Sequence, residues 1–262
     1  MTSLRLASLV LAVTALAACS RGDLDSAEDA DESATVTSAE SALTVELSDE
    51  VGQPVSATSE ALAQAAAARV PTRMTPSGCV TATPSGATVT YVLTNCTGPW
   101  GLVKVNGTLT AVYSRGMGGA VQVVITGNGI KANNATFDVN ATVNATQAAG
   151  VKRAQVVSQS TGTGPRGATI ERNGSYTVTW DAATECLTLD GTWQTTVARR
   201  QASTVVTAFK KCAGACPAAG GSIVYTGAFG NVVTVTYDGS ATAQWTSSAN
   251  NRSGAVKLLC GG

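Results

Sequence analysis

Residues 135–146, ATFDVNATVNAT, constrain the fold of this chain more than any other stretch. Apolar and polar residues alternate through it: Phe137 and Val139 fall on one side of an extended backbone, and Asp138 and Asn140 fall on the other. A repeat of two is the period of a β-strand with one dry and one wet face, since successive side chains point to opposite sides. The stretch therefore predicts a half-buried strand. We interpret its polar side as a solvated sheet face rather than as a ligand-binding ladder.

Similar alternating runs rich in Val and Thr recur throughout residues 79–262, with turn residues between them at short intervals. Four of the intervals hold an Asn-Gly or Asp-Gly pair, which supplies the positive φ that a type I′ hairpin turn requires. These pairs occur at residues 106–107, 173–174, 190–191 and 238–239. We therefore expect residues 79–262 to form one all-β domain, a single antiparallel β-sandwich or closed β-barrel built from hairpins.

The charge of the chain is divided unevenly, although the formal total is zero. Residues 19–60 hold eleven acidic residues and one arginine, a net charge of −10, whereas residues 61–262 carry +9. An acidic stretch without aromatic residues buries too little apolar surface to offset the entropy of ordering it. We predict an acidic disordered tether over residues 19–56, within which residues 37–50 carry a pattern compatible with a short helix or a strand.

A short helix is predicted over residues 57–70, followed by a linker loop over residues 71–78. Ser59 is the expected N-cap, the alanines supply helix propensity, and Pro71 is expected to stop the helix. The apolar side of this helix consists mostly of methyl groups together with Leu62. It is compatible either with packing on the domain or with a spacer.

The N-terminus has the form of an export signal over residues 1–18. Arg5 precedes an apolar run over residues 6–17, which is too short to span a membrane but fits the core of a signal peptide. The run ends in Leu16-Ala17-Ala18-Cys19, which resembles the lipobox of the bacterial lipoprotein class. The resemblance implies cleavage before Cys19 and lipidation of its sulfur. Ser20 favours the outer membrane, with the domain facing the periplasm or the cell surface.

Six further cysteines follow Cys19, and an even number in an exported chain indicates disulfide bonds. Cys79 and Cys96 flank a hairpin expected to turn at residues 84–86, so we predict that they pair with each other. The predicted disulfide cysteines are Cys79, Cys96, Cys186, Cys212, Cys216 and Cys260.

Two pairings remain open for the last four cysteines. In one, Cys212 pairs locally with Cys216 and Cys186 pairs with Cys260. In the other, Cys186 pairs with Cys212 and Cys216 pairs with Cys260. A metal site at Cys212 and Cys216 would need further thiolates or histidines, and the chain has no histidine. We predict neither a metal nor a cofactor.

The absence of histidine also removes Ser-His-Asp and Cys-His catalysis. Asp181 and Glu185 are the only carboxylates of the domain that lie close together in the sequence, and both flank a short connection. A glycosidase needs two carboxyl groups held across a cleft, which this proximity does not establish. We predict no catalytic residues and a protein that is not an enzyme.

Candidate binding residues are Trp100, in a tight Gly-Pro-Trp-Gly loop, and the pair Arg199 and Arg200. Most other tryptophans share a strand face with small apolar residues and are expected in the core. We predict a lipid-anchored cell-envelope protein with a structural or binding role. Its expected partners are the membrane, through the lipid, and an anionic envelope glycan or another envelope protein, but not nucleic acid. The alternatives are a carboxylate-dependent hydrolase of envelope glycans and a carrier of an apolar ligand in a β-barrel.

Overall fold

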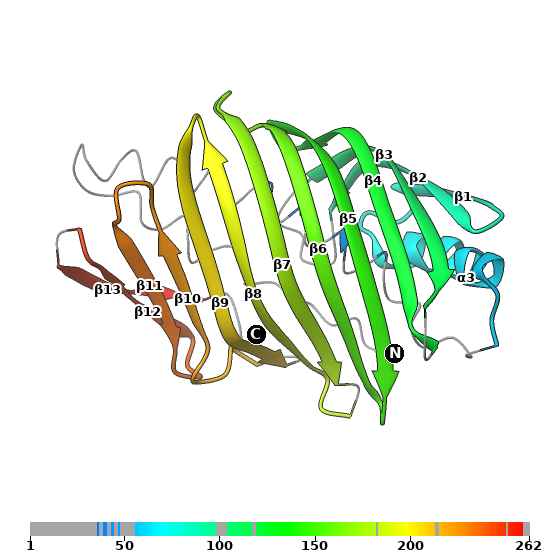
Figure 1. The fold of residues 1–262 in the computed structure, drawn as a ribbon. Helices are drawn as coiled ribbons and strands as arrows, with labels where there is room; N and C mark the ends of the chain where they lie inside the picture. The colour runs from blue at the N-terminus through cyan, green and yellow to red at the C-terminus, as the bar shows by residue number, and fades with distance from the viewer. Residues whose placement is uncertain are drawn as a thin grey trace.

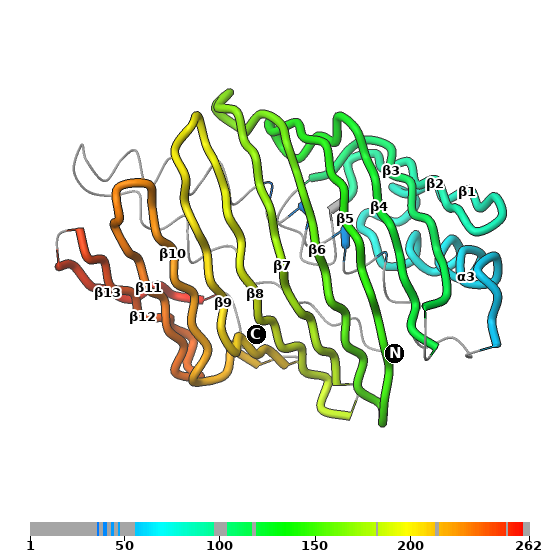
Figure 2. The backbone as a smooth tube through the Cα atoms, in the orientation of Figure 1, coloured from blue at the N-terminus to red at the C-terminus, as the bar shows by residue number. Residues whose placement is uncertain are grey.

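A computed structural model of the chain describes residues 36, 39–40, 43–44, 47, 56–97, 104–116, 119–181, 183–212, 215–249 and 251–258. Its main element is a single antiparallel sheet in which every strand pairs with the next one along the chain, as Figures 1 and 2 show. The predicted all-β, hairpin-built fold is thereby confirmed. The sheet is one open layer, because β1 and β13 form its two edges and do not pair.

Thirteen strands make up this sheet, and the longest lie at its centre. Their bounds are β1 Val80–Ser85, β2 Thr88–Thr97, β3 Lys104–Arg115, β4 Val121–Ala132, β5 Ala135–Ala148, β6 Val151–Thr163, β7 Thr169–Asp181, β8 Cys186–Val197, β9 Arg200–Cys212, β10 Ser222–Thr226, β11 Val232–Tyr237, β12 Thr242–Ser247 and β13 Arg252–Lys257.

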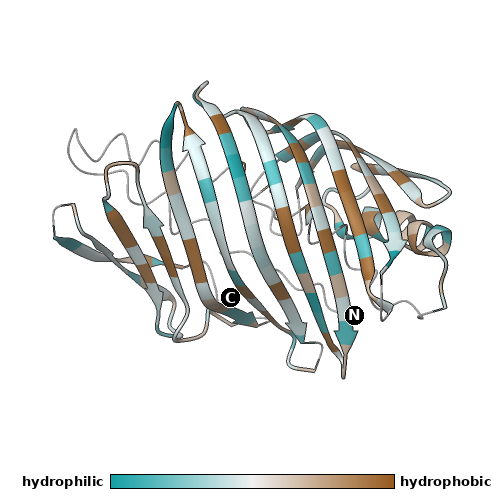
Figure 3. Ribbon diagram, viewed as in Figure 1, coloured by the Kyte–Doolittle hydropathy of each residue, from teal (hydrophilic) through white to brown (hydrophobic). Residues whose placement is uncertain are grey.

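The sheet has an inner and an outer face, which the alternation of side chains separates. In β5, Phe137, Val139 and Val143 are buried, whereas Asp138 and Asn140 are exposed. The predicted strand and its two faces are therefore confirmed. We call the buried side the inner face. Figure 3 shows how polar and apolar residues interleave along the central strands. The inner face is the hydrophobic core of the molecule, because helical residues from the N-terminal part of the chain cover it.

Helix α3, Ser59–Arg73, lies against β1, β2 and β3 near one edge of the sheet (Figure 1). It buries Leu62, Ala63, Ala66 and Val70, so it packs on the domain and is not a spacer. The predicted bounds were close, but the N-cap is Thr58, whose side chain accepts the Ala61 N–H, and not Ser59.

The helix also continues past Pro71, which was expected to stop it. Proline lacks an N–H and its ring clashes with the carbonyl four residues earlier, but in the last turn few helical hydrogen bonds remain to be lost. The helix accordingly ends at Arg73, and extended backbone at Met74 leads into the sheet.

Six residues within the predicted acidic tether are helical and fully buried, which corrects the expectation of a solvated tether at these positions. Five of them lie within residues 37–50, where a short helix was one of the two expectations. We call them the inner segment: Val36, Ala39, Glu40, Leu43, Thr44 and Leu47. Their spacing of three and four residues places them on one side of a helix. The physical reason for the error is averaging, since the acidic composition of residues 19–56 conceals an apolar stripe that is sufficient for docking.

Three of the four predicted Gly turns are wrong. Gly107, Gly174 and Gly191 lie inside β3, β7 and β8, and only Gly239 lies in a connection, between β11 and β12. Gly174 and Gly191 are needed for close packing: a Cβ would lie 2.6 Å from the Trp193 ring at Gly174 and 2.3 Å from Tyr176 Cβ at Gly191.

Four connections between the described strands are two residues long, and none of the four holds an Asn-Gly or Asp-Gly pair. Two of these hairpins have positive φ at both residues. Residues 149–150 connect β5 with β6, and residues 198–199 connect β8 with β9, with positive φ at both positions of each pair. These angles are those of type I′ turns. Gly150 is the single glycine among the four residues, so the Asn-Gly signature could not have identified either turn.

Three β-bulges interrupt the pairing of the long strands, and all are built alike. The residue in the left-handed region is Asn95 in β2, Gly129 in β4 and Ala208 in β9. In each case its N–H donates to a side-chain oxygen on a neighbouring strand, from Asn106, Asp138 and Asp190 respectively. Bulges bend a strand and increase its twist, which accounts for the curvature of the sheet.

Candidate binding site on the inner face

The inner segment is held on the sheet by hydrogen bonds as well as by apolar contacts. The Thr44 hydroxyl lies 2.6 Å from the Tyr176 hydroxyl, and the Tyr113 hydroxyl donates to the Leu47 carbonyl over 2.9 Å. Tyr176 comes from β7 and Tyr113 from β3, so the segment crosses the middle of the inner face. Four apolar side chains of the segment are no more than 1% exposed.

Glu40 and Arg172 form an ion pair at the centre of this contact. Arg172 Nη1 lies 3.0 Å from Glu40 Oε2, and the two side chains are 1% and 0% exposed. Ser160, which pairs with Arg172 across β6 and β7, donates its hydroxyl proton to the same Oε2 atom. Burial of both charges is costly unless each is paired and hydrogen-bonded, so the ion pair ties the segment to one position on the sheet.

Aromatic rings form the other wall of the site. The guanidinium carbon of Arg172 lies 5.5 Å from the centroid of the Trp193 ring, a cation–π contact. Trp193 is stacked on Tyr176, with centroids 5.2 Å apart. The ring fits there because Gly174, its partner on β7, has no side chain.

Several polar atoms around the ion pair make no hydrogen bond although they are buried. On the sheet these are the Ser158 hydroxyl, the Trp193 indole N–H and all three guanidinium nitrogens of Arg172, and on the segment Glu40 Oε1. The 3.0 Å ion pair is therefore not accompanied by an aligned guanidinium hydrogen bond. Buried polar groups are nearly always hydrogen-bonded in proteins, so such a cluster marks a site with unused recognition capacity.

None of these residues was predicted as a site residue, although the sequence carries a signal for each charge. Arg172 is in phase with Ile170 and Tyr176, which places a cation among inward-facing apolar residues. Glu40 lies four residues after Val36 and three before Leu43, which places an anion on an apolar helical side. A charge in phase with a buried face is the pattern to search for.

The predicted basic pair lies at the turn between β8 and β9. Arg199 is exposed, with φ at 75°, and Arg200 is half-buried at the start of β9. Arg200 pairs with Val197 on β8, and Val197 pairs with Ile170 on β7, so the basic pair lies two strands and two residues away from Arg172. Trp100 lies outside the described residues, as do Cys19, the signal peptide and Cys260.

The disulfide predictions are resolved for four cysteines. Cys79 pairs with Cys96, as predicted, and Cys186 pairs with Cys212. The alternative with a local Cys212–Cys216 bond is therefore wrong. Cys216 is itself disulfide-bonded. Its predicted bond to Cys260 stays a prediction.

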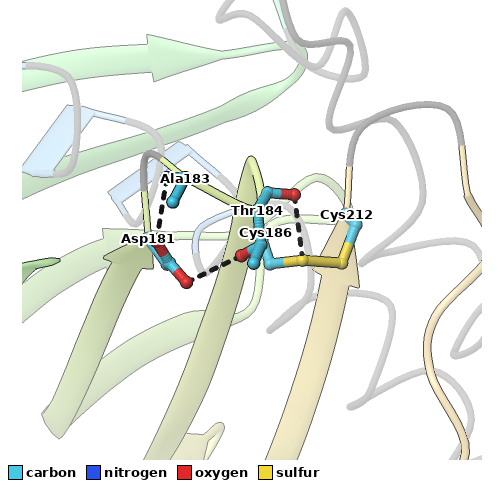
Figure 4. Close-up of a disulfide and its surroundings, with 5 residues drawn as sticks. All are labelled: Asp181, Ala183, Thr184, Cys186 and Cys212. Carbon is cyan, nitrogen blue, oxygen red and sulfur yellow. Dashed lines mark hydrogen bonds between the residues drawn. A yellow bond between two sulfur atoms is a disulfide. The ribbon is translucent and has the colours of Figure 1, made fainter. Parts of the chain in front are cut away.

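Asp181 ends β7 and Glu185 immediately precedes β8, so the two carboxylates of the hydrolase alternative both belong to the β7–β8 turn. Figure 4 shows Asp181 near the Cys186–Cys212 disulfide. Asp181 accepts hydrogen bonds from the Thr184 hydroxyl and the Ala183 N–H, which lower the pKa of its carboxyl, the Thr184 bond most. Glu185 is exposed, with φ at 51°. The Asp181 carboxylate therefore stabilises the β7–β8 turn through these two hydrogen bonds.

Two other titratable groups of the sheet have pKa values moved by burial. Burial lowers the pKa of Lys211 on β9 and raises the pKa of Tyr237 on β11 to about 12. Each shift disfavours the charged form of its side chain, as expected for groups removed from water. Within the described residues, no cluster of His, Cys, Asp and Glu could hold a metal ion.

Comparison with known proteins gives no relative for this chain: no family model, no curated protein and no solved structure matches it. None of the helices among the described residues is both long and apolar enough to cross a membrane.

Proposed function

We propose that this chain is a lipid-anchored cell-envelope protein with a non-enzymatic binding role, and that it binds through the inner face of the sheet. The observation that carries the binding role is the Arg172 site. It is a buried cation with unused donors on a mostly apolar face, covered by a segment from outside the sheet. Apolar surroundings with a few convergent polar groups are typical of ligand sites.

Two features support the envelope location. The Cys79–Cys96 and Cys186–Cys212 disulfides fit an oxidising compartment, in which exported proteins fold. The lipobox resemblance at residues 16–19 supplies the anchor, and stable anchoring requires more than one acyl chain, as lipoproteins carry. An outer-membrane position remains the proposal that Ser20 favours.

The anchor is tested by metabolic labelling with radioactive palmitate in a bacterial host. We expect the chain to be labelled and the Cys19→Ala variant to be unlabelled and released from the membrane fraction. Cys216→Ala is the matched control, since it removes another cysteine and is expected to keep the label. Equal labelling of the chain and of Cys19→Ala would contradict the anchor.

A second candidate function is the transport of an apolar ligand. The apolar character of the inner face between β3 and β7 favours this function. Between Arg172 and β3, the inner face presents residues that are almost entirely apolar and buried: Val139, Ala141, Ile125, Leu109 and Ala111. A binding partner that is a glycan would instead use exposed polar groups, of which Arg199 remains a proposed one.

A further inference from the structure

The contact between the inner segment and the sheet has the form of a ligand in its receptor. The segment presents one carboxylate, Glu40, surrounded by the apolar residues Val36, Ala39 and Leu43. The sheet buries two cations, Arg172 on β7 and Lys211 on β9, and Arg172 is the one that faces Glu40. Among the described residues, Glu40 is the carboxylate that Arg172 pairs with.

The sheet side of the site is rich in donors. Arg172 has three guanidinium nitrogens without a hydrogen bond, and the Trp193 indole N–H and the Ser158 hydroxyl also lack one. Ser160 donates to Glu40. A carboxylate with both oxygens directed at the sheet would use more of these donors than Glu40 does, because Glu40 Oε1 has no hydrogen-bond partner.

The apolar part of the inner face begins directly beside the cation. Ser160 and Arg172 share a cross-strand row with Val139 and Gly127, and the row continues to Leu109 on β3. Four strand spacings separate β7 from β3, about 19 Å at the usual distance between strands. A long unbranched apolar chain matches the length and the apolar character of this row, in which the Leu109 and Ile130 side chains pack over Gly127.

We propose that the inner face binds an amphiphile with a single carboxylate head and a long acyl chain, as in a fatty acid. The head lies at Arg172 and the chain follows the row toward β3. In the protein without ligand, the inner segment occupies the site, and Glu40 takes the place of the ligand carboxylate. This proposal rests on the proposed binding role of the inner face and adds the chemical class of the ligand.

Competition between segment and ligand follows from this arrangement. A ligand binds only the fraction of molecules in which the segment has left the site, and its apparent affinity falls by that fraction. A substitution that weakens the segment without altering the sheet therefore strengthens ligand binding. A purely structural ion pair predicts the opposite, because its loss would only disturb the fold.

The test uses the full chain carrying Cys19→Ala, so that acyl chains of an anchor do not compete. Equilibrium dialysis with radiolabelled palmitate and radiolabelled 1-hexadecanol measures the preference for a carboxylate over an alcohol of the same length. Glu40→Gln is expected to bind palmitate about tenfold more tightly than the reference chain. Glu171→Gln is the matched control, since Glu171 precedes Arg172 on the outer face of β7, and it is expected to change nothing.

Arg172→Gln identifies the head-group site. It is expected to reduce palmitate binding about tenfold or more and to leave 1-hexadecanol binding within twofold, so that the preference for the acid is lost. Circular dichroism verifies that each variant is folded. Equal binding of the acid and the alcohol by the reference chain and Glu40→Gln, or an acid preference that survives Arg172→Gln, would overturn the proposal.

Hydrogen exchange of the inner segment gives a second measurement. It uses the reference chain, which is the full chain with Cys19→Ala, and needs no further substitution. Saturating palmitate is expected to accelerate exchange at Glu40, Leu43 and Thr44 by displacing the segment, and unchanged exchange would overturn the proposal. Palmitate labelling of Cys19 is independent of these results. If Cys19 is labelled but the inner face does not bind palmitate, the lipid anchor is supported and the proposed ligand class is wrong. If the inner face binds palmitate but Cys19 is not labelled, the ligand class is supported and the lipid anchor is wrong.

Discussion

Glu171 and Arg172 are neighbours in β7, yet the two faces of the sheet treat their charges differently. Glu171 is exposed on the outer face, where water solvates it and a partner contributes little to stability. Arg172 is buried on the inner face, where an unpaired charge is strongly destabilising. Its partner comes from outside the sheet, since Glu40 lies in a segment that precedes it by more than a hundred residues. Without the inner segment, the inner face would therefore hold a buried charge that has no carboxylate partner.

The largest expected difference between the faces concerns apolar truncation. Phe137→Ala, on the inner face of β5, is expected to lower the free energy of unfolding by about 4 kcal/mol, because it leaves a cavity in the core. Val157→Ala removes a side chain that is 59% exposed on the outer face of β6, and a change below about 0.5 kcal/mol is expected. Urea denaturation measures both. Similar losses for the two variants would show that the outer face is also covered.

The ion pair itself is tested by a double-mutant cycle. Glu40→Leu leaves Arg172 without its carboxylate and is expected to destabilise the fold by about 3 kcal/mol. The double variant Glu40→Leu with Arg172→Met removes both charges, and recovery of about 2 kcal/mol relative to Glu40→Leu is expected. Glu171→Leu provides the outer-face control and should stay within about 0.5 kcal/mol. Strictly additive effects would mean that the two charges do not interact in solution.

Tyr237 extends the comparison to alkaline pH, because its hydroxyl is buried on the inner face without a hydrogen-bond partner. Its pKa is raised to about 12 in the folded chain from an ordinary value of 10.0. The unfolded chain therefore loses this proton first as the pH rises. Stability from this group is complete below pH 10 and declines by about 1.4 kcal/mol per pH unit until about pH 12.

Tyr237→Phe is the matched variant, since it keeps the edge-to-face contact with Phe209. It is expected to flatten the decline and, because a lone buried hydroxyl is removed, to gain about 1 kcal/mol at pH 7. Thermal denaturation between pH 7 and pH 11.5 measures both effects. If stability declines equally with rising pH in the unsubstituted chain and in Tyr237→Phe, the decline is caused by other titratable groups.

The smallest expected effect separates two polar residues of the outer face. Asp138→Ala removes the oxygen that accepts the Gly129 N–H at a bulge, and a loss of about 1 kcal/mol is expected. Asn140→Ala, two residues along the same exposed side of β5, should change the free energy of unfolding by less than about 0.5 kcal/mol. Equal changes in the free energy of unfolding for the two variants would mean that the Asp138 hydrogen bond at the bulge does not stabilise the fold.

The strands of the sheet could be predicted because the alternation that identifies each strand lies within its own short stretch of sequence. Alternation at residues 135–146 determines which side chains of β5 are buried, and the same period identifies Tyr176 and Val178 as inward-facing. The Cys79–Cys96 bond followed from a hairpin with nearby ends. An open edge could not be predicted, since closure depends on the curvature accumulated over all strands rather than on any single residue.

The turns and the site could not be predicted because they depend on contacts between distant residues. Gly174 is a glycine because the Trp193 ring lies against it, and Gly191 because Cβ and the backbone of Tyr176 do. A dipeptide pattern cannot distinguish these reasons from a turn. The docking of Glu40 on Arg172 depends on a face that exists only after the sheet has formed. Composition alone gave the opposite expectation for the inner segment.

Hydrogen exchange at residues 36–47 of the purified full chain, with Cys19→Ala to keep it soluble, tests the central claim most directly. If the inner segment completes the inner face, the amides of Leu43, Thr44 and Leu47 exchange roughly 100-fold or more slowly than in an unstructured chain. Glu40→Leu is expected to remove most of that protection, whereas Glu171→Leu keeps it. Exchange of these amides at the rate of an unstructured chain, in the protein that carries Cys19→Ala alone, would contradict the docking of the inner segment.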